Sequence, residues 1–276
     1  MKVSLYTKVF QYLHFRKIIP LIKDFGYDGL ELDRLPEAGP TLFKELTNSY
    51  GLDIVALQSS AHVASGSNIA SGNADKRFDG AKSVANAIDF ARDCACPIVQ
   101  IRGMYCWPYS SPYKGFWKRA CQELRRLASR AESSNVKLSL HLKHTIAYLI
   151  NSPWAARDMI EEVGSSALGV TFDTGTLNLM TFRADSLVGF VEILKDVIVH
   201  VHVSDNDGYK DFKYPPGRGN INWEVLLMAL RDIQYDGYLS VDLAGGFMQR
   251  DPHGASFESI KYLRNRLNDI ENGNRP

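Results

Sequence analysis

The sequence lacks the features that mark membrane, secreted or nucleotide-binding proteins. No run of about 18 apolar residues occurs anywhere in it. The opening stretch, MKVSLYTKVFQYLHFRK, has no long apolar core before its next charges, so no signal peptide is evident. No G-x-G-x-x-G or G-x-x-x-x-G-K-S/T motif follows the first β-rich run, which removes the usual phosphate-binding loop. We therefore expect a cytoplasmic protein with no membrane segment.

The sequence also lacks an excess of either charge, and it has few cysteines. Lys and Arg number 32 against 31 for Asp and Glu, which leaves a net charge of +1, so no overall field would hold nucleic acid or an acidic membrane surface. Cys94, Cys96, Cys106 and Cys121 have no C-x-x-C spacing, and we interpret them as structural thiols in a reducing compartment. The expected partner is a small molecule.

What the sequence does contain is a regular alternation of two patterns. Short β-rich runs alternate eight times with longer segments whose apolar residues recur every three or four positions. The runs are Val3–Thr7, Gly29–Leu32, Ile54–Gln58, Ile98–Arg102, Val136–His141, Leu168–Asp173, Ile198–Val203 and Tyr238–Asp242. Since such barrels typically have about 250 residues, this pattern predicts one (β/α)8 TIM barrel domain over residues 1–276. An open doubly wound sheet is the alternative, and we expect disorder over the extreme C-terminus, from about residue 270 to 276.

The strands are predicted to point polar side chains into the barrel. Side chains alternate along a strand, and the apolar set should press against the helices. In VKLSLH, this rule turns Leu138 and Leu140 outward and Ser139 and His141 inward. Applied to the other runs, the rule places these further side chains in the lumen: Ser4, Tyr6, Glu31, Gln58, Gln100, Arg102, Thr171, Asp173, His200, His202, Ser240 and Asp242.

Four of the inward residues, His141, Asp173, His202 and Asp242, lie at or within one residue of the carboxyl ends of consecutive strands. The carboxyl ends of barrel strands form the rim where active sites lie, so these side chains should meet. Two imidazoles and two carboxylates suit a divalent ion such as Mn²⁺, Fe²⁺, Co²⁺, Ni²⁺ or Zn²⁺ better than Mg²⁺ or Ca²⁺. The alternative is that the four groups only hydrogen-bond one another inside the barrel.

A family resemblance is carried by the segments GYDGLELD, GVTFDTGTLNL, HVHVSDNDG and PPGRGNINWEVLLMALRDIQYDGYLSVDL. They resemble the xylose isomerase-like barrel superfamily, specifically its sugar phosphate isomerase/epimerase branch. The resemblance extends over nearly the whole chain. It implies a barrel, monomeric or homo-oligomeric, with one divalent metal ion at the carboxyl rim, that acts on sugars, keto-sugars, inositol-derived ketones or related polyols. We expect Mn²⁺ as the ion, and the sequence is compatible with a dimer or tetramer as well as with a monomer.

The resemblance also shows where this chain departs from the family. Family members usually bind the metal through a glutamate, an aspartate, a histidine and a glutamate on the fifth to eighth strands. Asp173 and His202 match, whereas His141 and Asp242 stand at the two glutamate positions. Thr176 replaces a histidine often found three residues after the aspartate. We expect Thr176 to bind the substrate. Because the two glutamates of the epimerases also carry the proton, a new base is needed alongside the shorter carboxylate of Asp242.

Candidates for the new base are Lys143 and His144, which follow the fifth strand, and Glu31 on the second. By strand parity Lys143 lies on the same side as His141, and a divalent cation beside it should lower the pKa of its ammonium. An exposed loop lysine is the alternative. His62, in QSSAH, is a further candidate, and it sits where family members often place a substrate contact.

Four residues are candidates for binding the substrate or orienting the site. Arg218 lies in the glycine-containing loop PPGRGN, where an arginine can clamp substrate oxygens. Asp205 is expected to orient a ligand histidine or a substrate hydroxyl. Arg102 should meet a carboxylate such as Glu31, or an anionic substrate group, because an unpaired buried cation is costly. Trp107, in MYCWPYSSPYKGFW, is expected to line the pocket and stack on a sugar.

The leading hypothesis for function is a metal-dependent isomerase or epimerase of a keto-sugar or related polyol, acting through a metal-stabilised enediolate. A metal-dependent lyase is the first alternative, because dehydration of a ketocyclitol or β-elimination from a 3-keto glycoside or C-glycoside needs the same acidified C–H. The second alternative is a sugar-binding or partner subunit that has lost catalysis. The neutral charge and single ligand set argue against the DNA-repair endonuclease of the same superfamily.

Overall fold

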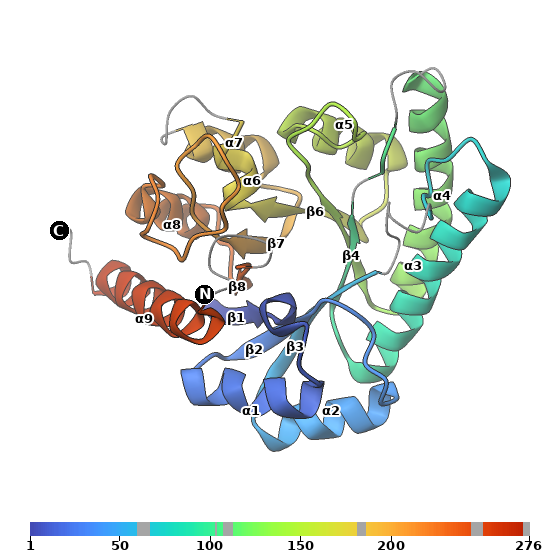
Figure 1. The fold of residues 1–276 in the computed structure, drawn as a ribbon. Coiled ribbons are helices and arrows are strands. Elements are labelled where there is room, and N and C mark those ends of the chain that lie inside the picture. Colours follow the sequence, from blue (N-terminus) through green and yellow to red (C-terminus); the bar gives the residue numbers. More distant parts are fainter. Residues whose placement is uncertain (60–66, 103, 107–112, 181–185, 244–250, 273–276) are drawn as a thin grey trace.

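The computed structural model describes residues 1–59, 67–102, 104–106, 113–180, 186–243 and 251–272. In these residues eight parallel strands close into a barrel, in which each strand pairs with its neighbours in chain order and β8 pairs with β1 (Figure 1). The strands are β1 (Lys2–Tyr6), β2 (Gly29–Leu32), β3 (Asp53–Gln58), β4 (Ile98–Arg102), β5 (Lys137–His141), β6 (Leu168–Asp173), β7 (Ile198–Val203) and β8 (Tyr238–Val241). The predicted TIM barrel is confirmed.

Helices connect the strands and form the outer layer of the barrel (Figure 1). They are the short 3-10 helix η1 (Thr7–Phe10), α1 (Phe15–Phe25), α2 (Pro40–Ser49), α3 (Ala74–Cys94), α4 (Tyr113–Ser133), α5 (Pro153–Val163), α6 (Thr174–Asn178), α7 (Ser186–Leu194), α8 (Trp223–Asp232) and α9 (Pro252–Glu271). None of the helices in the described ranges is long and apolar enough to cross a bilayer.

Local sequence signals explain where several helices begin and end. Asn73, Ser152 and Asn222 precede α3, α5 and α8, and each side chain accepts a hydrogen bond from a backbone N–H of the first turn. Gly164 ends α5 in the left-handed conformation, which only glycine adopts without strain. The helix α9 continues to Glu271, so residues 270 and 271 are helical. The rest of the segment expected to be disordered, residues 273–276, lies outside the described residues.

The alternation of side chains places the polar residues in the lumen, as predicted. Leu138, Leu140, Val170 and Phe172 are fully buried and belong to the apolar core between the sheet and the helices. Polar side chains of different strands meet inside the barrel instead. For example, Thr171 on β6 contacts Ser139 of β5 at 2.6 Å and Gln100 of β4 at 3.3 Å. These cross-barrel contacts are possible only if the polar faces of the strands point inward.

Candidate metal centre at the carboxyl rim

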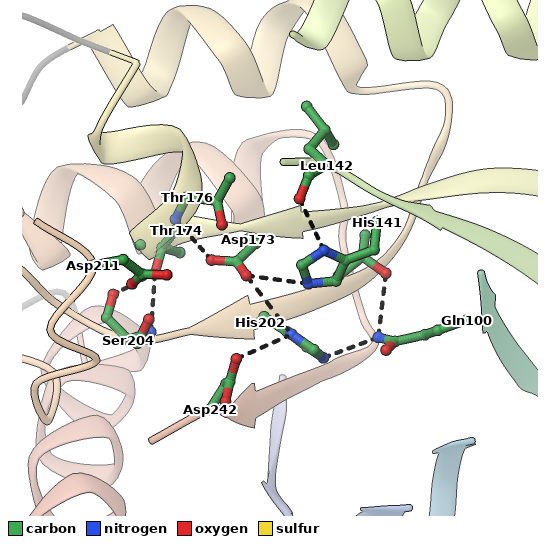
Figure 2. A network of polar contacts seen from close by, with 12 residues as sticks. Gln100, His141, Leu142, Asp173, Thr174, Thr176, His202, Ser204, Asp211 and Asp242 are labelled. Atoms are coloured by element: carbon green, nitrogen blue, oxygen red, sulfur yellow. Dashed lines mark hydrogen bonds and ion pairs between the residues drawn. The ribbon is translucent and has the colours of Figure 1, made fainter. Parts of the chain in front are cut away.

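The four predicted metal ligands converge at the carboxyl ends of β5 to β8 (Figure 2). The Oδ2 atom of Asp173 lies 3.2 Å from Nε2 of His141 and 3.9 Å from Nδ1 of His202. The Oδ2 atom of Asp242 lies 3.8 Å from the same Nδ1. All four side chains are buried. His141, Asp173 and His202 each offer a ligand atom within 4.8 Å of the others.

Hydrogen bonding fixes which nitrogen of His141 faces the site. Its Nδ1 lies 2.9 Å from the carbonyl oxygen of Leu142, which only accepts, so Nδ1 carries the hydrogen and donates. The Nε2 atom is then a bare lone pair that faces the Asp173 carboxylate. Burial lowers the pKa of His141 to about 3, so the ring stays neutral at physiological pH. Two lone pairs at 3.2 Å repel each other unless a cation lies between them.

His202 is oriented in the same way by Glu31. The Nε2 atom of His202 lies 2.8 Å from both carboxylate oxygens of Glu31. Burial alone would raise the pKa of Glu31, but the imidazoles of His202 and His200 hold it well below its usual range, so this carboxylate is ionised and accepts. The Nε2 atom of His202 therefore donates, and its Nδ1 is a buried lone pair without a hydrogen-bond partner among the described residues. That lone pair points toward Asp173 and Asp242.

Glu31, a predicted candidate for the base, instead supports His202 through hydrogen bonds. Besides His202, it accepts from Nε2 of His200 at 2.8 Å and from the hydroxyl of Ser240 at 2.5 Å. The carboxylate is fully buried beneath the histidine, on the side away from Asp173. A carboxylate that accepts from a ligand histidine fixes its tautomer and raises its basicity toward a metal.

Replacing Glu31 with glutamine tests this supporting role. The amide would turn an N–H toward one of the two imidazole N–H groups, so we expect the affinity for Mn²⁺ to fall about 10- to 100-fold. Isothermal titration calorimetry on chelator-stripped protein measures the change. Glu37→Gln, at an exposed position on the loop after β2, is the matched control and should leave the affinity unchanged. An unchanged affinity in Glu31→Gln would show that the histidine does not depend on this carboxylate.

Asp173 is oriented by the helix that follows it. It is the N-cap of α6, and its Oδ1 accepts the backbone N–H of Thr176 at 2.9 Å. The side chain of Thr176 is buried, and its backbone N–H contacts Asp173. The predicted contact of Thr176 with the substrate stays a prediction. Because Oδ1 is held by the helix, Oδ2 is left to face the two histidines.

A lysine that the sequence reasoning missed also reaches this site. Lys213, in the loop after β7, places Nζ 3.2 Å from Oδ2 of both Asp173 and Asp242, and 3.5 Å from Oδ2 of Asp211. Burial would lower the pKa of Lys213, but the three carboxylates raise it above its ordinary value, so the group is an ammonium. The only sequence signal is a lysine between two aromatic residues in DFKYPPG, and strand periodicity does not cover such a loop.

Asp205 holds that loop in place and does not face the metal ligands. Its carboxylate accepts the backbone N–H groups of Asn206 at 2.9 Å and Gly217 at 2.9 Å, and the indole N–H of Trp223 at 2.7 Å. The backbones of Asp205 and Tyr214 form an antiparallel bridge. The expectation that Asp205 orients a ligand histidine or a substrate hydroxyl is therefore replaced by a role in building the loop that carries Lys213.

Two cationic residues predicted for the site, Lys143 and Arg102, differ in their surroundings. Lys143 is half-buried at the end of β5, and burial, together with the positive charges of Arg102 and Lys213, lowers its pKa. Arg102 is buried with its guanidinium 5.4 Å from the centre of the Tyr6 ring. Glu31, one of the partners expected for Arg102, instead accepts from two histidines and Ser240, and the expected contact with an anionic substrate group stays a prediction.

The remaining predicted residues lie away from the cluster or outside the described ranges. Arg218 is at the surface, where its guanidinium pairs with Glu258 of α9 and not with groups of the site. His144 is exposed. His62 and Trp107 fall outside the described residues.

The donor set fits a divalent first-row ion. Two imidazole nitrogens, both buried and both left bare by their tautomers, face carboxylate oxygens that lie 3.2 to 3.9 Å away. Lys213 balances the charge of the carboxylates, but neither bare nitrogen has a hydrogen-bond donor among the described residues. Mixed nitrogen and oxygen ligands suit Mn²⁺, Fe²⁺, Co²⁺, Ni²⁺ or Zn²⁺. Asp173, His141 and His202 would hold the ion, with Asp242 as a fourth ligand, and further positions would remain for substrate oxygens.

A family comparison identifies the chain. Residues 19–266 match the model of the xylose isomerase-like TIM barrel family. The chain belongs to this family. The resemblance stated from the sequence motifs is thereby confirmed.

Relatives and solved structures extend the comparison. Fructoselysine 3-epimerase of Shigella flexneri is 24% identical over 280 residues, 98% of this chain and all of that protein. The uncharacterized protein MJ1311 of Methanocaldococcus jannaschii is 33% identical over 123 residues, 43% of this chain and 41% of that protein. A crystal structure of a D-tagatose 3-epimerase-like protein superposes with a TM-score of 0.85 and 23% identity over 99% of both chains. This last likeness establishes the fold.

Proposed function

We propose that this protein is a metal-dependent epimerase of a keto-sugar or a closely related polyol. The observation that carries the proposal is the pair of bare imidazole nitrogens, on His141 and His202, that face the carboxylate of Asp173 at the active rim of the barrel. Membership of the xylose isomerase-like family and the full-length similarity to a fructoselysine 3-epimerase support sugar chemistry at this rim.

The reaction requires an acidic C–H next to a carbonyl and proton transfer on two faces of that carbon. When bound, the divalent ion supplies a Lewis acid that makes this C–H acidic, and Mn²⁺ is the ion we propose. His141, Asp173 and His202 hold the ion. Lys143, after β5, and Asp242, after β8, come from well-separated parts of the rim. We assign Nζ of Lys143 and the carboxylate of Asp242 to the two faces. The group on one face takes the proton as a neutral amine or a carboxylate, and the group on the other face, in its protonated form, returns one.

The positive charges of the site are suited to the oxygens of the substrate. Arg102 is a buried guanidinium whose Nε has no hydrogen-bond partner among the described residues, so a donor remains for a ligand. A basic cradle for a phosphate group is not evident from the sequence, and we therefore propose a free sugar or polyol as the substrate. The similarity to a fructoselysine 3-epimerase over 98% of this chain favours epimerisation over the lyase alternative.

Turnover in D₂O tests this function. Protein loaded with Mn²⁺ is incubated with a panel of free ketohexoses and fructoselysine, and products are followed by NMR and mass spectrometry. An epimerase incorporates one deuterium at the carbon next to the carbonyl and forms the epimer. A product lighter by water or an aglycone would indicate the lyase, and binding of a sugar without any exchange would indicate the binding subunit.

A further inference from the structure

The strongest unexplained feature is the ammonium of Lys213 inside the candidate metal centre. It donates to Oδ2 of Asp173 at 3.2 Å and lies 3.2 Å from Oδ2 of Asp242, and both side chains are expected metal ligands. A third carboxylate, Asp211, lies 3.5 Å away. The side chain of Lys213 is 9% exposed, so its partners and not solvent compensate its charge.

The loop is built to deliver this side chain. Lys213 has a φ of +50°, in the left-handed region that residues other than glycine rarely adopt. Its neighbours Phe212 and Tyr214 stack their rings with centroids 5.2 Å apart, and Tyr214 forms the backbone bridge to Asp205. Because both neighbouring side chains lie together, Lys213 between them points the other way, toward Asp173. A strained backbone that is held on both sides is typical of a functional position.

The same carboxylate oxygen serves two kinds of cation. Oδ2 of Asp173 faces the bare nitrogens of His141 and His202, and it is also 3.2 Å from Lys213. A divalent ion bound to that oxygen would repel the ammonium strongly, since screening by water is weak in a buried site. Metal binding and the present contacts of Lys213 therefore oppose each other.

We propose that Lys213 is a built-in counter-cation that competes with the divalent ion for Asp173 and Asp242. It neutralises the carboxylates while the protein is free of metal, and it moves off them when the ion binds. The affinity for metal is consequently lower than the ligand set alone would give. This inference rests on the metal centre of the proposed function.

Lys213→Met tests the competition, because methionine is of similar length and carries no charge. Full-length protein is stripped with a chelator and titrated with Mn²⁺ in a calorimeter, and thermal unfolding is followed with and without the ion. We expect Lys213→Met to bind Mn²⁺ about tenfold more tightly or better, and to unfold at a lower temperature than wild type only when metal is absent. Lys210→Met, at an exposed lysine of the same loop, should match wild type in both measurements.

Two further variants keep the result decisive. Lys213→Arg retains the charge and should leave the Mn²⁺ affinity close to that of wild type. If Lys213→Met does not fold, Lys213→Gln takes its place with the same expected tightening. Equal or weaker Mn²⁺ binding in the folded neutral variant, or equal tightening in Lys213→Arg, would overturn the counter-cation role. Absence of Mn²⁺ binding in wild type and variants alike would overturn the metal centre itself, and this inference with it.

Discussion

Replacing Asp173 with asparagine is expected to abolish metal binding and to lower turnover by about 1000-fold or more, while the barrel stays folded. Within the part of the chain that the structure describes, Oδ2 of Asp173 is the carboxylate oxygen that lies near both bare imidazole nitrogens. An asparagine amide can donate a hydrogen bond to the bare Nε2 of His141. This neutral contact keeps the barrel folded when no metal is bound. Lys213 keeps Asp242 and Asp211 as partners in this variant.

Metal content, turnover and thermal unfolding are measured together for Asp173→Asn. Asp207→Asn, at an exposed aspartate in the loop after β7, is the control and should behave as wild type. If Asp173→Asn retained metal at the wild-type level, the carboxylate would be excluded as a ligand. If it lost metal but retained turnover, the reaction would not depend on the ion.

Replacing Lys143 with methionine is expected to reduce turnover by about 100- to 10,000-fold at unchanged metal content, which is the range that a positioned proton-transfer group contributes. Methionine keeps the length of the side chain but has no basic atom. The deuterium exchange at the substrate carbon should fall by the same factor, because Lys143 acts at the proton-transfer step. Single-turnover exchange in D₂O, with bound metal determined on the same sample, measures both quantities.

Thr145→Ala provides the control for Lys143→Met, since Thr145 is an exposed residue of the same loop. It should change neither exchange nor metal content. Normal deuterium exchange in Lys143→Met with full metal content would remove this lysine from the mechanism. Another group at the rim would then have to be the base.

The barrel and the cluster of side chains at its rim could be predicted because each rests on a local, periodic signal. Strand parity placed His141, Asp173 and His202 inside the barrel, and parallel pairing brings the carboxyl ends of β5, β6 and β7 to one rim. The observed strand bounds differ from the predicted ones by one residue at most. For residues on a strand, the alternation of side chains and the direction of the strand are enough to predict their position. The alternation gives the face of the sheet, and the residue's place along the strand gives its distance from the rim.

The sequence could not predict which groups support the site from below or reach it from a loop. Parity put Glu31 in the lumen but did not give its depth, and it lies one layer below the ligands, where it meets His200 and His202. Lys213 arrives from a loop whose path depends on the many hydrogen bonds of Asp205 and on a left-handed residue. Neither the depth of Glu31 nor the path of the loop that carries Lys213 has a periodic signature in the sequence.

Bound metal per chain is the most direct test of the central claim. Elemental mass spectrometry is applied to protein purified without added metal and without a histidine tag, and wild type is compared with His141→Ala. The bare Nε2 of His141 against Asp173 predicts about one Mn, Fe, Co, Ni or Zn ion in each wild-type chain, and a loss of that ion in the variant. Wild-type protein that is empty, cannot be loaded and is equally stable with and without added metal would contradict the metal centre and leave a hydrogen-bonded lumen in its place.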